Sequence, residues 1–266
     1  MAVITVKNGA LEYLCAENIG TQHCFTTRVG GVSQGFTAGL NIGVHRGDPK
    51  ENVVQNYRLL GNALGFDPDC LVLGNQVHGN TVRVVTRQDA RGLDHLQYPQ
   101  CDALITNTPG VGLVVFTADC TPVLLWDSDT GAVGAVHAGW KGTALDICGN
   151  AVRAMQEAFG CRPENICAAI GPNIARCCFE TDADVPQAML DTYGNSIAEH
   201  IHPKENKYYV NLKAINAYAL HRAGVENIAI SDHCTACTPS HYWSHRKMGQ
   251  NRGSQGAIIL CQEVLP

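Results

Sequence analysis

The sequence predicts a mixed α/β (α+β) fold with β-hairpins, formed as a single domain over residues 1–266. Short apolar runs bounded by turn residues alternate with segments whose apolar residues repeat at the helical period. No internal repeat, low-complexity linker or shift in composition divides the chain. A chain of 266 residues can bury about three quarters of its unfolded surface, which suffices for one large core.

Composition and charge narrow the classes of partner. Hydrophobic residues make up 45% and charged residues 16% of the chain, as in ordinary globular proteins. The net charge of -5 argues against a nucleic-acid partner. No stretch approaches the roughly 20 apolar residues of a membrane span, and the N-terminus lacks a signal-peptide pattern. We expect a cytosolic (cytoplasmic) protein without a membrane partner, whose 13 cysteines are mostly reduced and buried.

The first half of the chain contains paired strand signals and one helix. Apolar runs bounded by turn residues predict strands at 3–6, 11–15, 71–77, 81–85, 101–105 and 111–117. Turn residues separate the members of each pair, at Asn8-Gly9, His78-Gly79-Asn80 and Asn107-Thr108-Pro109-Gly110. Apolar residues at i, i+4, i+7 and i+11 predict an amphipathic helix from Pro49 to Leu64.

The second half alternates strands with helices. Strands are predicted at 122–126, 132–136, 166–170, 208–212, 228–231 and 257–261. The helical period predicts helices at 143–159, 182–193 and 213–223. The segments 86–100 and 198–206 are polar and are predicted to be surface loops.

A glycine-rich segment covers residues 25–43. Backbone N–H groups in such loops approach anions closely, and Arg28 adds a forked donor for phosphate or carboxylate. The alternative is a plain connecting loop with a surface arginine. Gly139-Trp140-Lys141-Gly142, which leads into a predicted helix, is a second place where an anion can rest.

The two strands 122–126 and 132–136 predict a hairpin with a chemically reactive residue at each open end. If its turn is centred near Asp129, Cys120 faces His137 with Cβ atoms about 4.5–5.5 Å apart. Each residue alone is more commonly a buried core residue. His78, at a neighbouring turn, adds a second imidazole. Two imidazoles and one thiolate form a catalytic zinc set with a fourth position open to water.

Other chemistries stay open at this point. Cys120 can act as a nucleophile with His137 as its base, or the protein can bind a ligand without catalysis. The run Cys234-Thr235-Ala236-Cys237, with His241 and His245, has the spacing of a small structural zinc site. These ligands are too close together for a standard zinc finger, so pocket or core roles are favoured.

Eight segments resemble the YfiH family, formerly called polyphenol oxidase laccases and now described as purine nucleoside phosphorylases. They are TTRVGGVSQG, GLNIGVH, GNQVHG, TADCTPVLLWD, AVHAGWKG, AIGPNIARCCFE, YWSHR and RGSQGAIIL, spread from Thr26 to Leu260. The resemblance implies one catalytic domain with a zinc cofactor held by His78, Cys120 and His137, which are also the implied catalytic residues. It also implies a layered fold like that of bacterial toxin cysteine deamidases.

The resemblance implies phosphorolysis of adenosine, inosine, guanosine and methylthioadenosine, with an adenosine deaminase side activity. Purine nucleoside and phosphate are therefore the expected partners, and the oligomeric state is left open. Some relatives have been described as peptidoglycan-precursor editing amidases, which, with a Cys-His hydrolase, is the alternative. Laccase activity is rejected, because trinuclear copper needs several His-x-His pairs and this chain has only His200-Ile201-His202.

The matched motifs also imply contacts beyond the zinc ligands. Substrate contacts are expected at four residues: Arg28, Asn41, Lys141 and Arg246. Lys141 replaces the usual arginine of the family, which keeps the positive charge but loses bidentate geometry. Asp119 is expected to orient a zinc ligand or to act as an acid or base, although strand alternation directs it away from Cys120.

Overall fold

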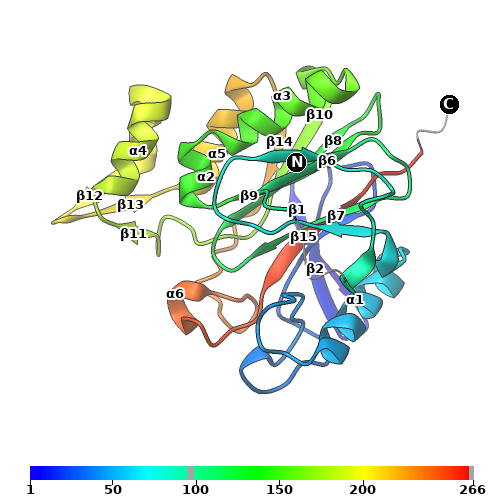
Figure 1. Ribbon diagram of the computed structural model, residues 1–266. Helices are drawn as coiled ribbons and strands as arrows, with labels where there is room; N and C mark the ends of the chain where they lie inside the picture. The colour runs from blue at the N-terminus through cyan, green and yellow to red at the C-terminus, as the bar shows by residue number, and fades with distance from the viewer. Residues whose placement is uncertain (95–98, 264–266) are drawn as a thin grey trace.

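Two six-stranded β-sheets form the centre of the protein in a computed structural model that describes residues 1–94 and 99–263 (Figure 1). The first sheet has the order β1 (Val3–Asn8), β2 (Leu11–Ala16), β3 (His23–Thr26), β15 (Gln255–Leu260), β7 (Gly112–Thr117) and β4 (Leu71–Leu73). The second has the order β14 (Asn227–Ile230), β10 (Ile166–Ile170), β8 (Thr121–Asp127), β9 (Val133–Ala138), β6 (Ala103–Thr106) and β5 (Val82–Val84). Pairing is antiparallel except for β4 with β7, β10 with β14, and β5 with β6.

The helices of the described residues are α1 (Lys50–Leu64), α2 (Trp140–Ala144), α3 (Ile147–Phe159), α4 (Asp184–Tyr193), α5 (Leu212–Arg222) and α6 (His245–Met248). Helix α1 packs against the first sheet, α2, α3 and α5 pack against the second, α4 lies beside the small sheet strand β11 (Glu180–Thr181), and α6 is a single turn in the C-terminal segment. Short 3-10 turns occur at Gly35–Thr37, Pro68–Cys70, Gly92–Asp94, Pro163–Asn165 and Gly194–His200. No helix among the described residues is both long and apolar enough to cross a membrane.

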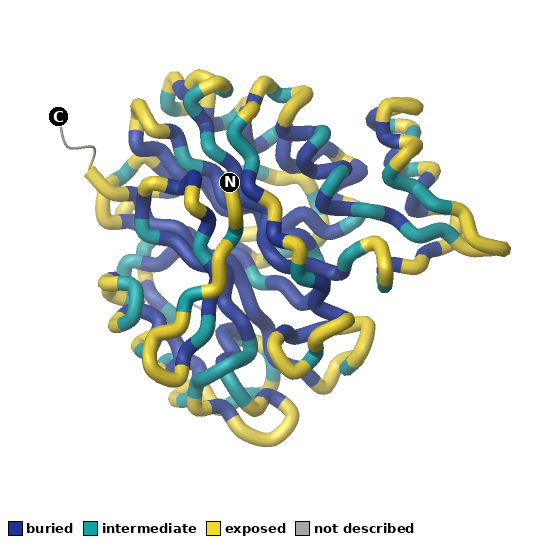
Figure 2. Tube along the Cα trace, turned by 180° about the vertical axis from the view of Figure 1, so that it is seen from behind, coloured by how far each residue is buried: buried dark blue, intermediate teal, exposed yellow. Residues whose placement is uncertain are grey.

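Three buried clusters follow from the alternation of apolar side chains along the strands. One lies between the sheets, where Val115 of β7 and Leu124 of β8 belong to the same cluster. A second joins the first sheet to α1 and contains Tyr57. The third joins the second sheet to α3 and α5 and contains Val152. The result is a layered α/β structure with buried central strands and an exposed periphery (Figure 2).

Several predicted elements are confirmed. The opening hairpin pairs β1 with β2, with Asn8 opposite Leu11. Helix α1 begins one residue after Pro49 and ends at Gly65 in the left-handed conformation that favours glycine. The predicted hairpin pairs β8 with β9, and β10, β14 and β15 lie within a residue or two of their predicted positions.

Two of the predicted strand pairs are not hairpins. β4 and β5 join different sheets, as do β6 and β7, so the turns at 78–80 and 107–110 carry the chain between the two layers. Turn residues mark where a chain changes direction, but they do not decide which sheet the next strand joins. β4 and β5 have three residues each, and both add to the edge of a sheet by parallel pairing.

Two other predictions are wrong in their local structure. The helix predicted at 143–159 starts earlier and is broken between α2 and α3 by Asp146, whose φ is 57°. The carboxylate of Asp146 accepts hydrogen bonds from Arg153 and Arg222, which stabilises this break. The segment 198–206 contains β12 (Ile201–Lys204), which pairs with β13 (Lys207–Val210) in a small sheet completed by β11 (Glu180–Thr181). Of the predicted loop 86–100, residues 95–98 lie outside the described residues.

Candidate active site

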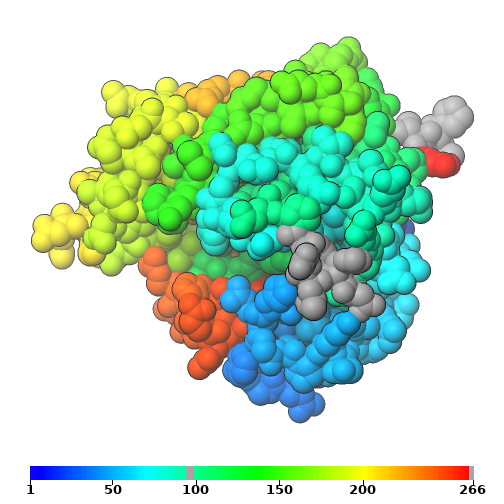
Figure 3. Space-filling model, viewed as in Figure 1, coloured from blue at the N-terminus to red at the C-terminus, as the bar shows by residue number. Residues whose placement is uncertain are grey.

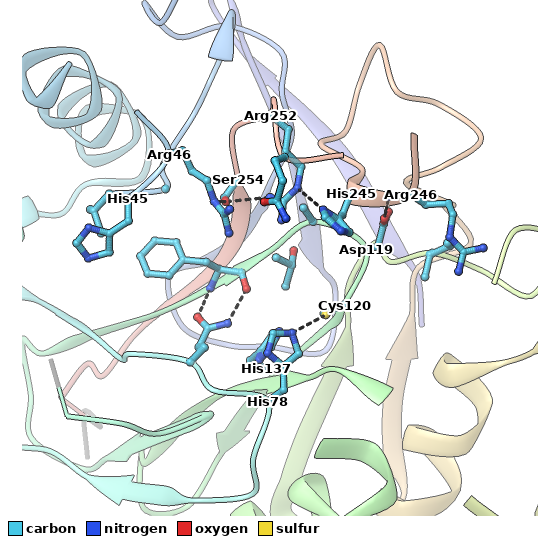
Figure 4. A pocket seen from close by; sticks show the side chains of 18 of the residues that line it. His45, Arg46, His78, Asp119, Cys120, His137, His245, Arg246, Arg252 and Ser254 are labelled. Atoms are coloured by element: carbon cyan, nitrogen blue, oxygen red, sulfur yellow. Dashed lines mark hydrogen bonds between the residues drawn. The ribbon is translucent and has the colours of Figure 1, made fainter. Parts of the chain in front are cut away.

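The three residues predicted to bind zinc lie together at one end of the second sheet (Figure 4). His78 comes from the crossing between β4 and β5, Cys120 precedes β8, and His137 belongs to β9. Their possible ligand atoms all lie within 4.8 Å of one another, and Cys120 Sγ is 3.8 Å from His78 Nε2. We call these residues the His-Cys-His triad.

The hairpin register differs from the predicted one. Pro122, and not Cys120, lies opposite His137, because the turn is centred about one residue later in the chain than predicted. The carboxylate of Asp127 accepts the N–H groups of Asp129 and Thr130 and sets this turn. Cys120 therefore lies just outside β8, after Asp119, whose φ of 91° turns the backbone there. The thiol reaches the histidines through this bend rather than through cross-strand pairing.

Asp102, which was not predicted from the sequence, positions two members of the triad. Its buried carboxylate lies 2.8 Å from His137 Nδ1. It also accepts hydrogen bonds from the backbone N–H groups of Val77, His78 and Gly79, at 3.2, 2.9 and 2.8 Å. These bonds hold His78 at a φ of 61°, which is sparsely populated by residues other than glycine. With Nδ1 directed at Asp102, Nε2 of His137 faces Cys120 and can bind a metal once its own proton is released.

The electrostatics of the triad favour a thiolate. Burial raises the pKa of Cys120, but the charge of His137 and hydrogen bonds to both histidines outweigh it and lower the pKa to about 6. Burial lowers the pKa of His137, whereas the charge of Cys120 and the bond to Asp102 raise it to about 9. For Asp102, burial raises the pKa, and the bonds from His137 and Gly79 bring it below its usual value. A thiolate near neutral pH is the form that metal binding and nucleophilic attack both require.

The space beside the triad fits a metal ion. A Cβ atom added at Gly139 would lie 2.9 Å from His78 Cδ2, 3.3 Å from Cys120 Sγ and 3.7 Å from His137 Cε1. Only glycine therefore leaves the volume between the three side chains open. One thiolate and two imidazoles at this spacing match the donors of a catalytic zinc site, in which a fourth position remains for water or substrate.

The triad forms one side of a cavity of about 590 Å³, and two arginines line the other side (Figure 4). Arg46 Nε donates to Ser254 Oγ at 3.2 Å. Arg252 is buried, and burial together with the nearby charge of Arg46 lowers its pKa to about 10. Two guanidinium groups brought this close are suited to binding an anion such as phosphate.

These two arginines come from opposite ends of the chain. The C-terminal segment that carries Arg252 lies beside the N-terminal segment that carries Arg46 on one face of the molecule (Figure 3). Neither residue was predicted from the sequence as an anion-binding candidate. Arg252 begins the quoted motif RGSQGAIIL, and Arg46 directly follows GLNIGVH, so their position beside family motifs was the available signal.

Of the four predicted substrate contacts, Arg246 is the one that lines the cavity among the described residues. Its guanidinium donates to the carbonyl oxygens of Cys178 and Glu180, at 2.9 and 3.0 Å. Asp119 also lines the cavity. Its carboxylate accepts hydrogen bonds from the Thr235 hydroxyl and the Arg246 N–H, at 2.6 and 2.7 Å. Asp119 thus braces the cavity wall, whereas Asp102 is the carboxylate that contacts a triad histidine.

The other three predicted contacts lie away from the described lining of the cavity. Arg28 donates to two backbone carbonyls and stacks on Trp243, with 4.2 Å between the guanidinium carbon and the ring centroid. Lys141 lies over the ring of Trp140. Asn41 is fully buried, and its side-chain oxygen accepts the N–H group of Ser254 at 2.8 Å. Asn41 therefore supports the loop beside Arg252.

The second zinc pattern considered from the sequence has different partners in the structure. His245 lines the cavity, and His241 contacts the Ser240 hydroxyl. In the part of the chain that the structure describes, neither histidine joins Cys234 and Cys237 in a metal-binding group, and the place of His245 in the cavity wall agrees with the favoured pocket role. The two cysteines lie instead beside a vicinal pair from another segment, in a group that we call the four-cysteine cluster: Cys177, Cys178, Cys234 and Cys237.

Comparisons with known proteins agree with this architecture. A family model described as multi-copper polyphenol oxidoreductase laccase matches residues 22–262. A protein of Deinococcus radiodurans named purine nucleoside phosphorylase is 40% identical over 252 residues, which are 94% of this chain and 92% of that protein. Purine nucleoside phosphorylase YfiH of Shigella flexneri is 34% identical over 228 residues, 86% of this chain and 89% of its own. The crystal structure of YlmD from Geobacillus stearothermophilus has a TM-score of 0.90 at 33% identity and covers 98% of this chain and 100% of that one.

Proposed function

Because this chain belongs to the YfiH family, whose model is described as multi-copper polyphenol oxidoreductase laccase, we propose that it is a zinc-dependent purine nucleoside phosphorylase. One observation carries the proposal. A cavity of about 590 Å³ has the His-Cys-His triad on one side and Arg46 with Arg252 on the other. This volume lies in the range of small-molecule sites, roughly 300–1,000 Å³, and the two sides offer separate partners for a nucleoside and for phosphate.

Phosphorolysis sets the requirements for the site. An oxygen of phosphate forms a bond to C1′ of the ribose, and the C1′–N bond breaks with its electron pair leaving on the purine. Arg46 and Arg252 would hold the phosphate by charge-assisted hydrogen bonds, with the Ser254 hydroxyl beside them. By holding the phosphate in the cavity, the two arginines would also place its attacking oxygen beside the sugar of the bound nucleoside.

The triad would hold zinc through Cys120 Sγ, a nitrogen of His78 and Nε2 of His137. When bound there, zinc supplies Lewis acidity and makes water a stronger nucleophile near neutral pH. Asp102 keeps the Nδ1 proton of His137 and fixes its ring. A thiolate and two neutral imidazoles would suit zinc better than the oxygen-preferring ions of many phosphate sites.

The expected substrates are adenosine, inosine, guanosine and methylthioadenosine, with hydrolytic deamination of adenosine as a side activity. In deamination, water adds to the purine carbon that bears the amine, and ammonia leaves. Arg246, at the cavity wall, is the best placed of the expected substrate contacts. Substrate-binding roles for Arg28, Asn41 and Lys141 stay predictions. These residues would affect substrate binding indirectly, through the loops that they contact. The single catalytic domain over 1–266 and the cytoplasmic location also stay predictions.

The decisive experiment is incubation of the purified protein with adenosine, with and without phosphate, followed by separation of products. Adenine and ribose 1-phosphate that form only with phosphate support phosphorolysis, and inosine in either case supports deamination. Arg252→Gln should raise the KM for phosphate more than the KM for adenosine. If neither product forms with a zinc-loaded protein, the proposal is wrong.

The second candidate function is Cys-His hydrolysis, including amide cleavage in peptidoglycan precursors. It is favoured by the sequence of contacts from Cys120 to His137 to Asp102, which resembles a nucleophile, its base and an orienting carboxylate. The expected likeness to toxin cysteine deamidases belongs to this alternative. Full amide hydrolysis by chelator-treated, zinc-free protein would favour it. Loss of activity on chelation and recovery with zinc would favour the phosphorylase.

A further inference from the structure

A second group of metal-binding side chains lies outside the cavity described above. Cys177 and Cys178 follow β10, whereas Cys234 and Cys237 belong to the loop after β14. Sγ of Cys237 lies 3.5 Å from that of Cys177 and 3.4 Å from that of Cys178, and Cys177 and Cys178 are 3.8 Å apart. All four sulfur atoms lie within 4.8 Å of one another.

These separations fit tetrahedral coordination. Zinc–sulfur bonds of about 2.3 Å in a tetrahedron place the sulfur atoms about 3.8 Å apart. A set of four thiolates leaves no position for water or substrate, which is typical of structural zinc sites. Sulfur-only tetrahedral sets select zinc or iron–sulfur centres over ions that prefer oxygen.

The arrangement is less suited to disulfide bonds. Cys237 lies at nearly equal distances from Cys177 and Cys178, yet it can form a disulfide with one of them at most. A disulfide requires the two sulfur atoms to approach to about 2.05 Å and leaves the third thiol unpaired. A shared central ion instead engages all four sulfur atoms. The backbone N–H group of Ala175 also donates to Cys234 Sγ at 3.3 Å, as expected for a thiolate ligand.

The cluster connects two segments that build one wall of the cavity. The first contributes Ile174 and Phe179 to the lining, and the second leads into Arg246. The carbonyl of Cys178 accepts a hydrogen bond from the Arg246 guanidinium. Between Cys234 and Cys237, Thr235 donates its hydroxyl to Asp119 and its N–H group to the Asn173 carbonyl. An ion in the cluster would therefore hold both segments at their positions beside the active site.

We propose that Cys177, Cys178, Cys234 and Cys237 bind a second, structural zinc ion that fastens this wall of the cavity. The ion takes no part in the reaction, and its site is independent of the His-Cys-His triad. The proposal therefore stands or fails separately from the proposed phosphorylase activity.

Elemental analysis of four proteins tests the proposal, each purified without added metal under reducing conditions. We expect about two zinc ions per chain in the wild-type protein and about one in Cys237→Ser, in Cys120→Ala and in Cys177→Ser. Cys177 is exposed like Cys237 but lies on the other segment, so agreement between the two serine variants guards against a folding defect in either one. Loss of one zinc ion in Cys237→Ser would support zinc in the four-cysteine cluster. If the zinc content of Cys120→Ala then equals that of the wild-type protein, the triad binds no zinc, and the proposed catalytic zinc is wrong. Zinc that is unchanged in both cluster variants would overturn the proposal.

Cobalt gives an independent readout. Cys120→Ala, stripped of metal and titrated with Co²⁺, keeps the four-cysteine cluster as the one sulfur-rich metal-binding group among the residues that the structure describes. We expect intense near-ultraviolet sulfur-to-cobalt charge transfer and the visible bands of tetrahedral four-thiolate cobalt, both absent from Cys120→Ala/Cys237→Ser. Absence of these bands, or a native mass that indicates a disulfide within the cluster, would overturn the proposal.

Discussion

The His-Cys-His triad and the four-cysteine cluster are two sulfur-containing sites on neighbouring segments, but their surroundings differ. The triad combines one thiol with two imidazoles, is braced by the buried carboxylate of Asp102 and opens into a cavity. The four-cysteine cluster consists of thiols, two of which belong to exposed residues. One of its sulfur atoms, Cys234 Sγ, accepts a hydrogen bond from a backbone N–H group. The number and type of donor atoms, and the space left between them, therefore distinguish a reactive metal site from a structural one.

The largest expected effect is on activity and follows from removing the thiol of the triad. Cys120→Ala should lower kcat/KM for phosphorolysis by about 10³-fold or more, because the metal and the charges that it organises are lost together. Steady-state kinetics measures the change. Cys15→Ala, which removes a half-buried thiol outside both sites, should leave kcat/KM near the wild-type value. Near-normal activity of Cys120→Ala would place the chemistry elsewhere.

The two sites should also differ in thiol reactivity once metal is removed. The pKa of Cys120 is lowered to about 6, because the charge of His137 and hydrogen bonds to the triad histidines outweigh burial, so this thiol is ionised at neutral pH and protonates below about pH 6. The pKa of Cys177 is raised to about 11 by partial loss of hydration around its sulfur and by its hydrogen bond with Cys237, so it ionises only as the pH rises toward that value. After allowing for the lower nucleophilicity of the more acidic thiol, Cys120 should react about 50-fold faster near neutral pH.

Iodoacetamide labelling at several pH values, followed by peptide mass spectrometry, measures this contrast. Added zinc should protect both thiols. Equal labelling rates of Cys120 and Cys177 across neutral pH would contradict the thiolate assigned to the triad.

Asp102→Asn should weaken zinc binding at the triad by about 10–100-fold, because the amide cannot accept all the hydrogen bonds that the carboxylate accepts. Competition with a chromophoric chelator measures the affinity. Asp89→Asn, which alters a carboxylate paired with Arg83, is the matched control. Zinc at the four-cysteine cluster should be unaffected by either variant, and a loss there would mean that the sites are coupled.

Gly139→Ala should give the smallest effect, about tenfold weaker zinc binding at the triad, because overpacking typically costs about 1–3 kcal/mol. Its added Cβ would lie 2.9 Å from a carbon of the His78 ring. Gly134→Ala, on strand β9, which ends one residue before Gly139, meets its nearest neighbour at 3.4 Å and serves as the control. Unchanged zinc affinity in Gly139→Ala would show that the histidine ring can move without disturbing the site.

Much of the fold and part of the site could be predicted from local signals. The β8–β9 hairpin, α1 and the opening hairpin follow from apolar periodicity and turn residues. His78, Cys120 and His137 were found because their residue types and positions beside turns suggest metal binding. The register error at Cys120 arose because the side chain of Asp127 shifts the turn, which strand alternation alone does not reveal.

Contacts between distant segments could not be predicted in this way. Asp102 reaches His137 across 35 residues, and Arg46 reaches Ser254 across 208. Cys237 meets Cys177 and Cys178 at separations of 60 and 59 residues. No periodicity or turn signal connects such positions. The glycine-rich loop around Arg28 favoured anion binding by its guanidinium. In the structure this guanidinium donates to backbone carbonyls and stacks on Trp243 instead.

The family motifs, the α/β class and the residue types of the triad can be recognised in the amino-acid sequence. The sheet that each short strand joins, the carboxylate that orients His137 and the cysteines that meet become known only in the folded protein. Backbone periodicity is set by neighbouring residues, whereas burial of both faces of a strand, and of charges such as Asp102, depends on segments far away in the chain.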